Sequence, residues 1–160
     1  MLDRFAVIPA SYVYLLREGG RGTEVLLQLR QGTGYMDGCW AAAAAGHIER
    51  GETAFQAAQR EATEELGVTD LDLLFELTMH RTQGRNAVDE RVDFFFSARS
   101  WVGEPRLLEP DKAVALAWFP LAELPDPTVA HERVALGHLG QRIGYLSLGF
   151  GSRADSSASS

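Results

Sequence analysis

The amino-acid sequence predicts an α/β protein in which a mixed β-sheet is covered by helices on both faces. Several segments of strand length are alternately or continuously apolar, and helical segments interrupt them at two separate points of the chain. The chain has 160 residues, of which 46% are hydrophobic and 23% are charged, and this composition suits one soluble globular domain with a sizeable core. The patterning leaves the order of the strands open.

The N-terminal part of the chain is expected to form strands and a loop. Residues 11–16 and 24–30 are apolar runs on either side of the turn sequence REGGRG, which indicates two strands. Residues 31–38 form a glycine-rich loop. Residues 40–48 include five consecutive alanines, which favour a helix by propensity, but the run is too short to nucleate one and is bounded by glycines. We therefore expect a buried strand there.

A helix is expected from residue 53 to residue 66. Thr53 and Gln56 have the spacing of a capping box, in which the two residues bond each other's backbone N–H groups. Gly67 is the usual kind of residue just beyond a helix C-terminus. The apolar stripe of this helix consists of Phe55, Ala58, Ala62 and Leu66.

Further strands are expected in the second half of the chain. Residues 71–82 alternate between apolar and polar, residues 91–102 are apolar on both faces and indicate a central strand, and residues 116–121 form a short strand after a loop. In the alternating segment, one face carries Leu71, Leu73, Phe75, Leu77 and Met79, and the other carries Asp72, Glu76, Thr78 and His80.

A last helix is expected to begin with Asp126 as N-cap and Pro127 as its first residue. Its apolar side consists of Val129, Leu136, Leu139 and Ile143. His131 and His138 lie seven residues apart on this helix, and we interpret both as surface or packing residues rather than metal ligands. One domain is expected over residues 1–150, followed by a disordered serine-rich tail over residues 151–160.

Charge and composition exclude several classes of protein. The net charge of −7 argues against a broad nucleic-acid surface, which would need a basic stripe. No apolar run is long enough to cross a bilayer, and the N-terminus lacks the pattern of a signal peptide. Cys39 is the single cysteine, so an internal disulfide is excluded and a reducing compartment, the cytoplasm, is expected. We interpret Cys39 as a small core residue.

Three glutamates crowd the C-terminal end of the helix over residues 53–66. Glu61, Glu64 and Glu65 share one face, where like charges cost roughly 0.2–0.5 kcal/mol per pair, and they lie at the unfavourable end of the helix dipole. One interpretation is a solvated acidic face with an Arg60–Glu64 ion pair. The other is a site for a divalent cation, Mg²⁺ or Mn²⁺, which would share its ligand shell with substrate phosphates. We favour the cation because function is expected where local rules are broken together.

Around these glutamates the sequence resembles the Nudix box, G-x5-E-x7-R-E-U-x-E-E-x-G-U, in which U is apolar. The segment from Gly46 to Val68 contains every fixed position, with Glu52 and Arg60 at the required spacing. With the flanking strands and the final helix, the resemblance covers about residues 1–148. It implies a mixed-sheet α/β/α sandwich and a metal-dependent hydrolase that cleaves a pyrophosphate bond in a nucleoside diphosphate linked to another group.

The resemblance also assigns roles by position. The metal ligands that it implies are the side chains of Glu61, Glu64 and Glu65 and the carbonyl of Gly46. Glu52 and Arg60 would form an ion pair that fixes the loop against the helix. One of the glutamates, with Glu61 preferred, would orient or deprotonate the attacking water. A further acid is expected from a later loop, where Glu109 and Asp111 are candidates and a simple charged turn is the alternative.

Substrate phosphates need local cations in an acidic protein. The candidates are His80, Arg81 and Arg85, in a polar loop after a strand, and Arg30, at the end of a strand. For each of these cations the alternative is a solvated loop residue. Tyr35 and Met36 could stack on a base, and the alternative is that their loop packs over the protein. Trp40 and Trp118 are expected in the core, and His47 is a poor ligand for Mg²⁺ although it adjoins Gly46.

The resulting prediction is a Mg²⁺-dependent pyrophosphohydrolase, with Mn²⁺ as the alternative metal, that converts a nucleoside triphosphate to the monophosphate and pyrophosphate. The rival within enzymes is an ADP-ribose or nucleotide-sugar pyrophosphatase. Two rivals from other classes are a non-catalytic nucleotide-sensing module and a purely structural domain. The expected partner is a small nucleotide rather than nucleic acid or a membrane, and the expected state is a monomer or a homodimer.

Overall fold

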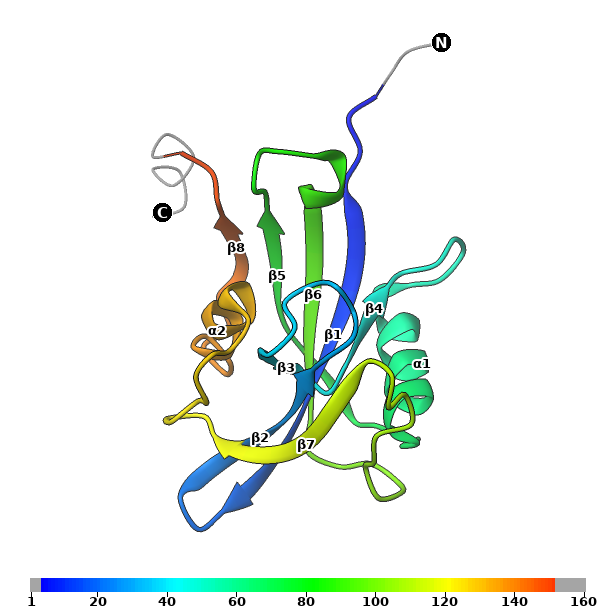
Figure 1. Cartoon of the computed structure of the whole chain (residues 1–160), viewed down its shortest axis with the longest axis vertical. Helices are drawn as coiled ribbons and strands as arrows, with labels where there is room; N and C mark the ends of the chain where they lie inside the picture. The colour runs from blue at the N-terminus through cyan, green and yellow to red at the C-terminus, as the bar shows by residue number, and fades with distance from the viewer. Residues whose placement is uncertain (1–3, 152–160) are drawn as a thin grey trace.

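The computed structural model of the chain describes residues 4–151 (Figure 1). The strands are β1 (Ile8–Gly19), β2 (Gly22–Arg30), β3 (Trp40–Ala42), β4 (Ala44–His47), β5 (Leu73–Arg81), β6 (Arg91–Ala98), β7 (Ala113–Pro120) and β8 (Gly144–Leu148). The helices are α1 (Ala54–Leu66), α2 (Ala130–Leu136) and the 3-10 turn η1 (Ala87–Asp89). The serine-rich tail expected to be disordered lies outside the described residues except for Gly151.

The long strand β1 organises the sheet. Its residues 8–15 pair in parallel with β6, residues 10–13 pair antiparallel with β4, and residues 16–19 pair antiparallel with β2. The strand order is β3-β2-β1-β6-β5-β8, with β4 also beside β1 and β7 also beside β2. Because β5 pairs antiparallel with β6 and parallel with β8, the predicted mixed sheet is confirmed, and β6 is a central strand as expected.

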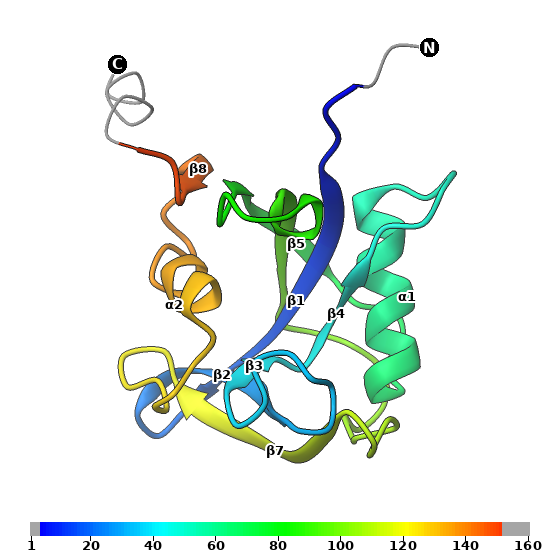
Figure 2. The ribbon, with the colours of Figure 1, turned by 45° about the horizontal axis from the view of Figure 1, so that its top comes forward.

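The two helices cover opposite sides of the sheet, as Figures 1 and 2 show. The buried residues Ala58, Ala62 and Leu66 of α1 pack in one core cluster with residues of β1 and β6. Ala135 and Leu136 of α2 pack in a second cluster that is built around Tyr12 and Phe95 of the same two strands. This three-layer arrangement confirms the predicted α/β/α sandwich.

Helix α1 has the caps that its sequence predicts. Thr53 Oγ1 accepts a hydrogen bond from the Gln56 N–H at 3.0 Å, and Gln56 Oε1 accepts one from the Thr53 N–H at 2.9 Å. Gly67 ends the helix with a φ of 74°, a conformation that favours glycine. Phe55 does not belong to the buried stripe, because it is 44% exposed at the first turn, where its ring meets that of Phe96 on β6.

Strand β5 departs from the predicted alternation. A register shift between Phe75 and Leu77 inserts a bulge, so the two residues do not share a face as expected: Leu77 is fully buried and Phe75 is 48% exposed. Glu76, which was expected on the polar face, is buried, and its carboxylate accepts hydrogen bonds from Ser97 Oγ at 2.7 Å and from the Gly140 N–H at 2.9 Å. Partners distant in the sequence therefore override the local period.

The final helix begins later than predicted. The Trp40 N–H donates to the Pro127 carbonyl and the Val129 N–H donates to the Trp40 carbonyl, both at 2.9 Å, so this segment pairs with β3 as extended chain. Helix α2 therefore starts at Ala130 with Val129 as its N-cap, and the assignment of Asp126 as N-cap is wrong. The short helix is followed by β8, which the sequence pattern did not predict, and Ile143 is 38% exposed beside it.

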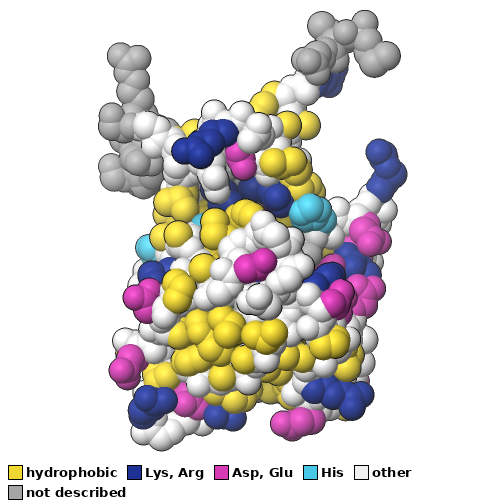
Figure 3. Space-filling model, viewed as in Figure 1, with side chains coloured by type: hydrophobic (Ala, Val, Ile, Leu, Met, Phe, Trp, Pro, Cys, Tyr) yellow, Lys and Arg dark blue, Asp and Glu magenta, His cyan; other side chains and the backbone are white. Residues whose placement is uncertain are grey.

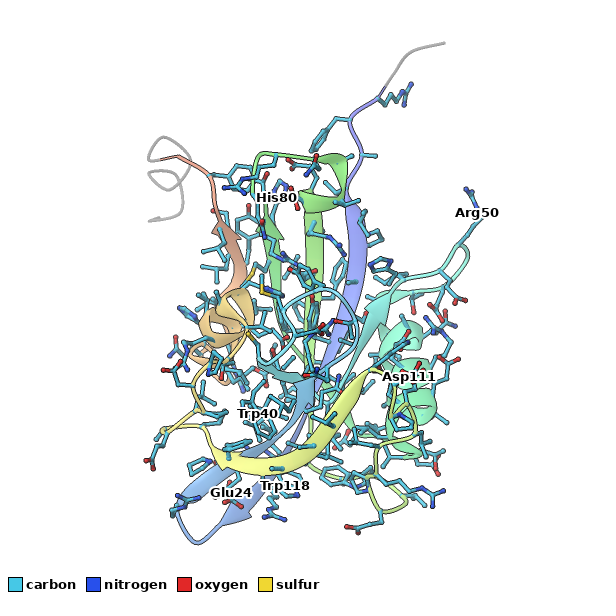
Figure 4. The ribbon with its side chains drawn as sticks, viewed as in Figure 1. Glu24, Trp40, Arg50, His80, Asp111 and Trp118 are labelled. Carbon is cyan, nitrogen blue, oxygen red and sulfur yellow. The ribbon has the colours of Figure 1, made fainter. Side chains whose placement is uncertain are left out.

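The remaining expectations concern the alanine run and the tryptophans. The alanine run is extended chain, as predicted, but it forms two short strands instead of one: β3 pairs with β2, and β4 pairs with β1. Strand β7 begins at Ala113, earlier than expected, because that residue pairs with Arg30 at the end of β2. Trp40 and Trp118 (Figure 4) are half-buried against the two core clusters, Trp40 with its ring edge-on to Phe119 at 4.7 Å between centroids.

Candidate active site

Strand β4 brings Gly46 against Glu61 of helix α1. A Cβ atom at Gly46 would lie 2.1 Å from Glu61 Oε1 and 2.3 Å from its Cδ. No side chain fits there while Glu61 keeps its place, so the glycine is explained by close approach. Gly46 lies within β4, where its carbonyl is held at a fixed position relative to the carboxylate.

Arg60 fastens the loop before α1 to the helix. Its Nε and one terminal nitrogen donate to the two oxygens of Glu52 at 2.7 and 3.0 Å, and the same terminal nitrogen donates to the His47 carbonyl at 3.2 Å. This paired hydrogen bonding holds the pKa of Glu52 down to about 2. Arg50, at the tip of the loop, extends away from the protein (Figure 4). The predicted Glu52–Arg60 ion pair is thus present.

The three glutamates of the helix end lie in different surroundings. Glu61 is nearly buried and accepts a hydrogen bond from the second terminal nitrogen of Arg60 at 2.8 Å. Glu65 accepts one from the Ala45 N–H on β4 at 2.7 Å. Glu64 is 55% exposed and lies 3.2 Å from Arg60, so the ion pair of the simpler interpretation also exists. Glu61 and Glu65 therefore face β4, and Glu64 lies at the solvent edge.

These carboxylates are electrostatically unfavourable without a cation. The pKa of Glu65 is raised to about 8, mainly by burial and also by the charges of Glu61 and Glu109, while the hydrogen bond from the Ala45 N–H opposes the rise. Burial also raises the pKa of Glu61, and Arg60 opposes that effect. Hard carboxylate oxygens beside a backbone carbonyl are the donors that Mg²⁺ and Mn²⁺ take. The donor set thus fits a divalent cation, although no three acidic, His or Cys groups within residues 4–151 already stand in coordinating positions.

Of the two later acids, Glu109 is the one brought to this site. Its charge acts on both Glu61 and Glu65, and its carboxylate forms an ion pair with Lys112 Nζ at 3.2 Å. The loop is tied to the end of α1 by the Leu108 N–H, which donates to the Glu65 carbonyl. Asp111 lies in the same loop, two residues before β7 (Figure 4).

Two adjoining hollows extend from Gly46 toward α2. The first is a cleft of about 170 Å³ lined by Ala10, Tyr12, Tyr35, Ala45, Gly46, His47, Arg81 and Arg91. The second is a cavity of about 210 Å³ lined by Tyr35, Met36, Arg81, Thr82, Gln83, Val129, Ala130, His131 and Leu148. Tyr35 and Arg81 belong to both, so the cleft connects the acidic site to a largely apolar cavity.

The structure separates the candidates for substrate binding. Arg81 is the last residue of β5 rather than a loop residue, and its side chain forms a buried ion pair with Asp93 at the boundary of the two hollows. His80 (Figure 4) is the preceding strand residue; its ring contacts Phe150, and it lines neither hollow. Arg85 is exposed in the loop after β5 and also lines neither. Only Arg81 of these three borders the cleft.

The glycine-rich loop is held over the cleft by Arg30. Its Nε donates to the Tyr35 carbonyl at 2.9 Å, a terminal nitrogen donates to Thr33 Oγ1 at 3.1 Å, and the guanidinium lies 5.7 Å from the centroid of the Tyr35 ring. Tyr35 is 45% exposed and Met36 is 40% exposed, and both line the apolar cavity. Arg30 therefore positions the loop, and Tyr35 and Met36 remain candidates for contact with a base.

Sequence reasoning did not assign three residues to these hollows: Arg91, His47 and His131. Arg91 and His47 line the cleft, with an Arg91 terminal nitrogen 2.9 Å from His47 Nε2. His131 lies in the wall of the apolar cavity, 3.1 Å from the Tyr12 hydroxyl, and burial lowers its pKa to about 3. One signal was available: Asp93 is a charged residue in the middle of the apolar stretch of β6, where an ion-pair partner is required.

The α/β/α sandwich and the acidic β4–α1 site define a class of protein, and comparison with known families identifies it. The sequence profile of the NUDIX domain matches residues 7–138, and the chain belongs to this family. Nudix hydrolases generally use divalent metal ions. In the residues that the structure describes, no helix is long and apolar enough to cross a membrane.

Two solved structures of MutT proteins are similar to this chain in fold. The chain is similar to a MutT NUDIX hydrolase from Burkholderia pseudomallei, with 28% identity, a TM-score of 0.71 and coverage of 83% of this chain and 98% of the other. It is similar in fold to a MutT protein from Bacillus halodurans, with 23% identity, a TM-score of 0.62 and coverage of 82% and 81%. Family and neighbours together support a pyrophosphohydrolase enzyme.

A third relative carries a different name. The chain is 31% identical over 118 residues to an isopentenyl-diphosphate Delta-isomerase from Jannaschia sp. (strain CCS1). The match covers 72% of this chain and 65% of the isomerase, so the chain spans slightly less than two thirds of that relative's length. The substrate of this chain is therefore a question for its own site residues.

Proposed function

We propose that the protein is a Mg²⁺-dependent hydrolase, with Mn²⁺ as the alternative metal, that cleaves a diphosphate bond in a nucleoside diphosphate derivative. The preferred substrate is a nucleoside triphosphate, which would give the monophosphate and pyrophosphate. The observation that carries the proposal is the packing of Glu61 against Gly46, beside Glu65, where Gly46 also lines a cleft that contains two arginines.

In this proposal the residues of the box hold the metal, position the loop and activate the water. The metal would be held by Glu61, Glu64 and Glu65, the Gly46 carbonyl and Glu109, and would neutralise phosphate charge and acidify bound water. Arg60 and Glu52 keep the β4–α1 loop against the helix, which fixes the Gly46 carbonyl relative to the carboxylates. Glu61 is preferred as the group that orients the water and accepts its proton as the water oxygen attacks phosphorus and a P–O bond breaks.

The apolar cavity supports a nucleotide as the substrate. Its volume of about 210 Å³ and its apolar residues Met36, Val129 and Leu148 suit a flat organic ring more than a second charged group. Tyr35, at its mouth, supplies an aromatic face for stacking. The rival substrates ADP-ribose and nucleotide sugars share the base and the diphosphate, so they would use the same hollows.

A second candidate function is favoured by one observation, the identity with an isopentenyl-diphosphate isomerase. Such a substrate has a diphosphate and no base, so it would use the metal end and leave the aromatic face of Tyr35 without a partner. Isomerisation moves a proton and releases no phosphate, which makes the two functions separable by product.

The test is phosphate release from a panel of compounds with Mg²⁺ and a coupling phosphatase or pyrophosphatase. The panel holds nucleoside triphosphates, oxidised triphosphates, ADP-ribose, nucleotide sugars, dinucleotide cofactors and isopentenyl diphosphate, the last followed by product chromatography. We expect turnover of one nucleotide class, its loss in Glu65→Gln, and its retention in the exposed control Glu104→Gln. Full turnover by Glu65→Gln would refute the mechanism. Metal-dependent nucleotide binding without turnover would instead favour a sensing module.

A further inference from the structure

A pair of arginines faces the acidic site from the other end of the cleft. Arg81, at the end of β5, and Arg91, at the start of β6, are directly opposite each other in the antiparallel ladder. Like charges at directly opposite positions destabilise a sheet. Arg81 is also only 6% exposed, which makes its charge costlier to keep there. Two local rules are broken together, as they are at the acidic end of α1.

Asp93 compensates only one of the two charges. It lies two residues after Arg91 on the same face of β6, it is fully buried, and its Oδ2 accepts the Arg81 Nε–H. Its other oxygen, Oδ1, is buried without a hydrogen-bond partner in the described part of the chain. One carboxylate between two guanidinium groups leaves a net positive charge at the cleft. Asp93 thus fixes the direction of Arg81 without neutralising the pair.

Both arginine side chains line the cleft while protein hydrogen bonds hold them in place. The bond to Asp93 uses Nε of Arg81, so its two terminal amino groups are not needed for that bond. Arg91 is held by Nε, which donates to the Val88 carbonyl at 2.7 Å, and by one terminal nitrogen, which donates to His47 Nε2 at 2.9 Å. Because arginine can only donate, His47 accepts at Nε2 in this arrangement. Both guanidinium groups are therefore positioned before any ligand arrives.

The position of the pair identifies what it could bind. The cleft shares Gly46 with the acidic site, and it shares Tyr35 and Arg81 with the apolar cavity. Figure 3 shows Lys or Arg side chains together with a His on this face of the molecule. A group held in the cleft would lie between a base in the cavity and a metal at the glutamates. In a nucleotide that group is the phosphate attached to the nucleoside.

We propose that Arg81 and Arg91 form an anion subsite for the nucleoside-linked phosphate of the substrate, with Asp93 as the positioning residue that aims Arg81. The inference rests on the proposed nucleotide hydrolysis and names the part of the substrate that this cleft binds. The subsite is built from protein groups alone, so it binds a nucleoside monophosphate without any metal. It discriminates the phosphate ester from the free nucleoside.

The experiment is calorimetric binding in excess EDTA, with AMP, GMP, CMP and UMP compared with the four nucleosides. We expect one monophosphate to bind at least tenfold more tightly than its nucleoside, and Arg91→Gln to weaken only the monophosphate, by about ten- to a hundredfold. Arg81→Lys should act similarly, because a lysine cannot bond Asp93 and the ligand together. Arg21→Gln, in the distant β1–β2 turn, removes the same charge and should change neither affinity.

Asp93 is tested as a positioning residue. Asp93→Asn keeps the size of the side chain and both arginines, so monophosphate should still bind, with a smaller preference over the nucleoside. In the Mg²⁺ assay we expect its KM to rise more than its kcat falls. An equal loss of both ligands, with a lowered melting temperature, would show a merely structural role for Asp93.

Two outcomes overturn the subsite. One is equal affinity, or no detectable affinity, for monophosphate and nucleoside in the wild-type protein without metal. The other is unchanged monophosphate affinity in a folded Arg91→Gln variant. This variant tests the subsite even if Arg81→Lys does not fold. These outcomes are independent of turnover. A protein that selects the monophosphate in EDTA but hydrolyses no compound with Mg²⁺ would refute the hydrolase and keep the subsite.

Discussion

The buried carboxyl of Glu132 makes a sharp prediction about stability and pH. Glu132 lies in the first turn of α2 and is 3% exposed. Its Oε1 accepts hydrogen bonds from the Tyr14 hydroxyl at 2.8 Å and from the Ala42 N–H at 2.7 Å, which dock α2 on β1 and β3. No arginine or lysine side chain forms an ion pair with it in the described residues. The perturbation is Glu132→Gln, which keeps the accepting oxygen and removes the ionisation.

The magnitude follows from the pKa. Burial raises the pKa of Glu132 from its ordinary 4.5 to about 7, and the bonds from Tyr14 and Ala42 oppose that rise. A raised folded pKa means that the folded state holds its proton more tightly than the unfolded state. The contribution of Glu132 to the free energy of unfolding is fully present below the pKa of the unfolded state and is lost as pH rises through the pKa of the folded state. At about 1.4 kcal/mol for each pH unit between the two values, the loss approaches about 3 kcal/mol.

The assay is urea unfolding of wild type and Glu132→Gln at about pH 5 and about pH 8. Other titrating groups are common to both proteins, so the difference between them isolates this carboxyl. We expect the variant to gain about 2 to 3 kcal/mol relative to wild type between the two pH values. Glu104→Gln, an exposed carboxyl, should show no such change. A difference between variant and wild type that is the same at both pH values would refute the buried-carboxyl argument.

Three further predictions follow from single contacts. Gly46→Ala places a Cβ 2.1 Å from a carboxylate oxygen of Glu61. Because that oxygen is at the end of a flexible side chain, the melting temperature should change little, but the displaced carboxylate should lower kcat/KM about a hundredfold. Retained activity would contradict this expectation. Glu52→Gln removes the charge that fixes Arg60, so the Mg²⁺ concentration for half-maximal rate should rise about ten- to a hundredfold, measured by metal titration. Leu66→Ala, at a fully buried position, should lower the unfolding free energy by about 2–5 kcal/mol in urea, without a change in the metal requirement.

The parts of the structure that the sequence predicted are those settled by neighbours in the chain. Thr53 caps α1 through Gln56, three residues away, and Arg60 reaches Glu52 across one loop. The failures lie where a distant partner decides. Glu76 is buried because Ser97 and Gly140 bond it, and no local pattern contains that information. The late start of α2 has the same cause, since Trp40 holds the preceding segment as extended chain.

The cleft shows why one half of a binding site can be found from a sequence and the other half missed. The glutamates stand within one helical turn, so their repulsion is visible as a spacing. Arg81 and Arg91 are separated by a loop and become neighbours only when β5 pairs with β6. Each cluster brings like charges together, and this repulsion remains although the side chains also form structural hydrogen bonds. A polyphosphate with its divalent cation carries both signs, with the metal toward the carboxylates and a bare phosphate toward the arginines. One ligand of that kind therefore relieves both costs at once, which is a stronger reason to assign the cleft to a metal-bound nucleotide than either cluster is separately.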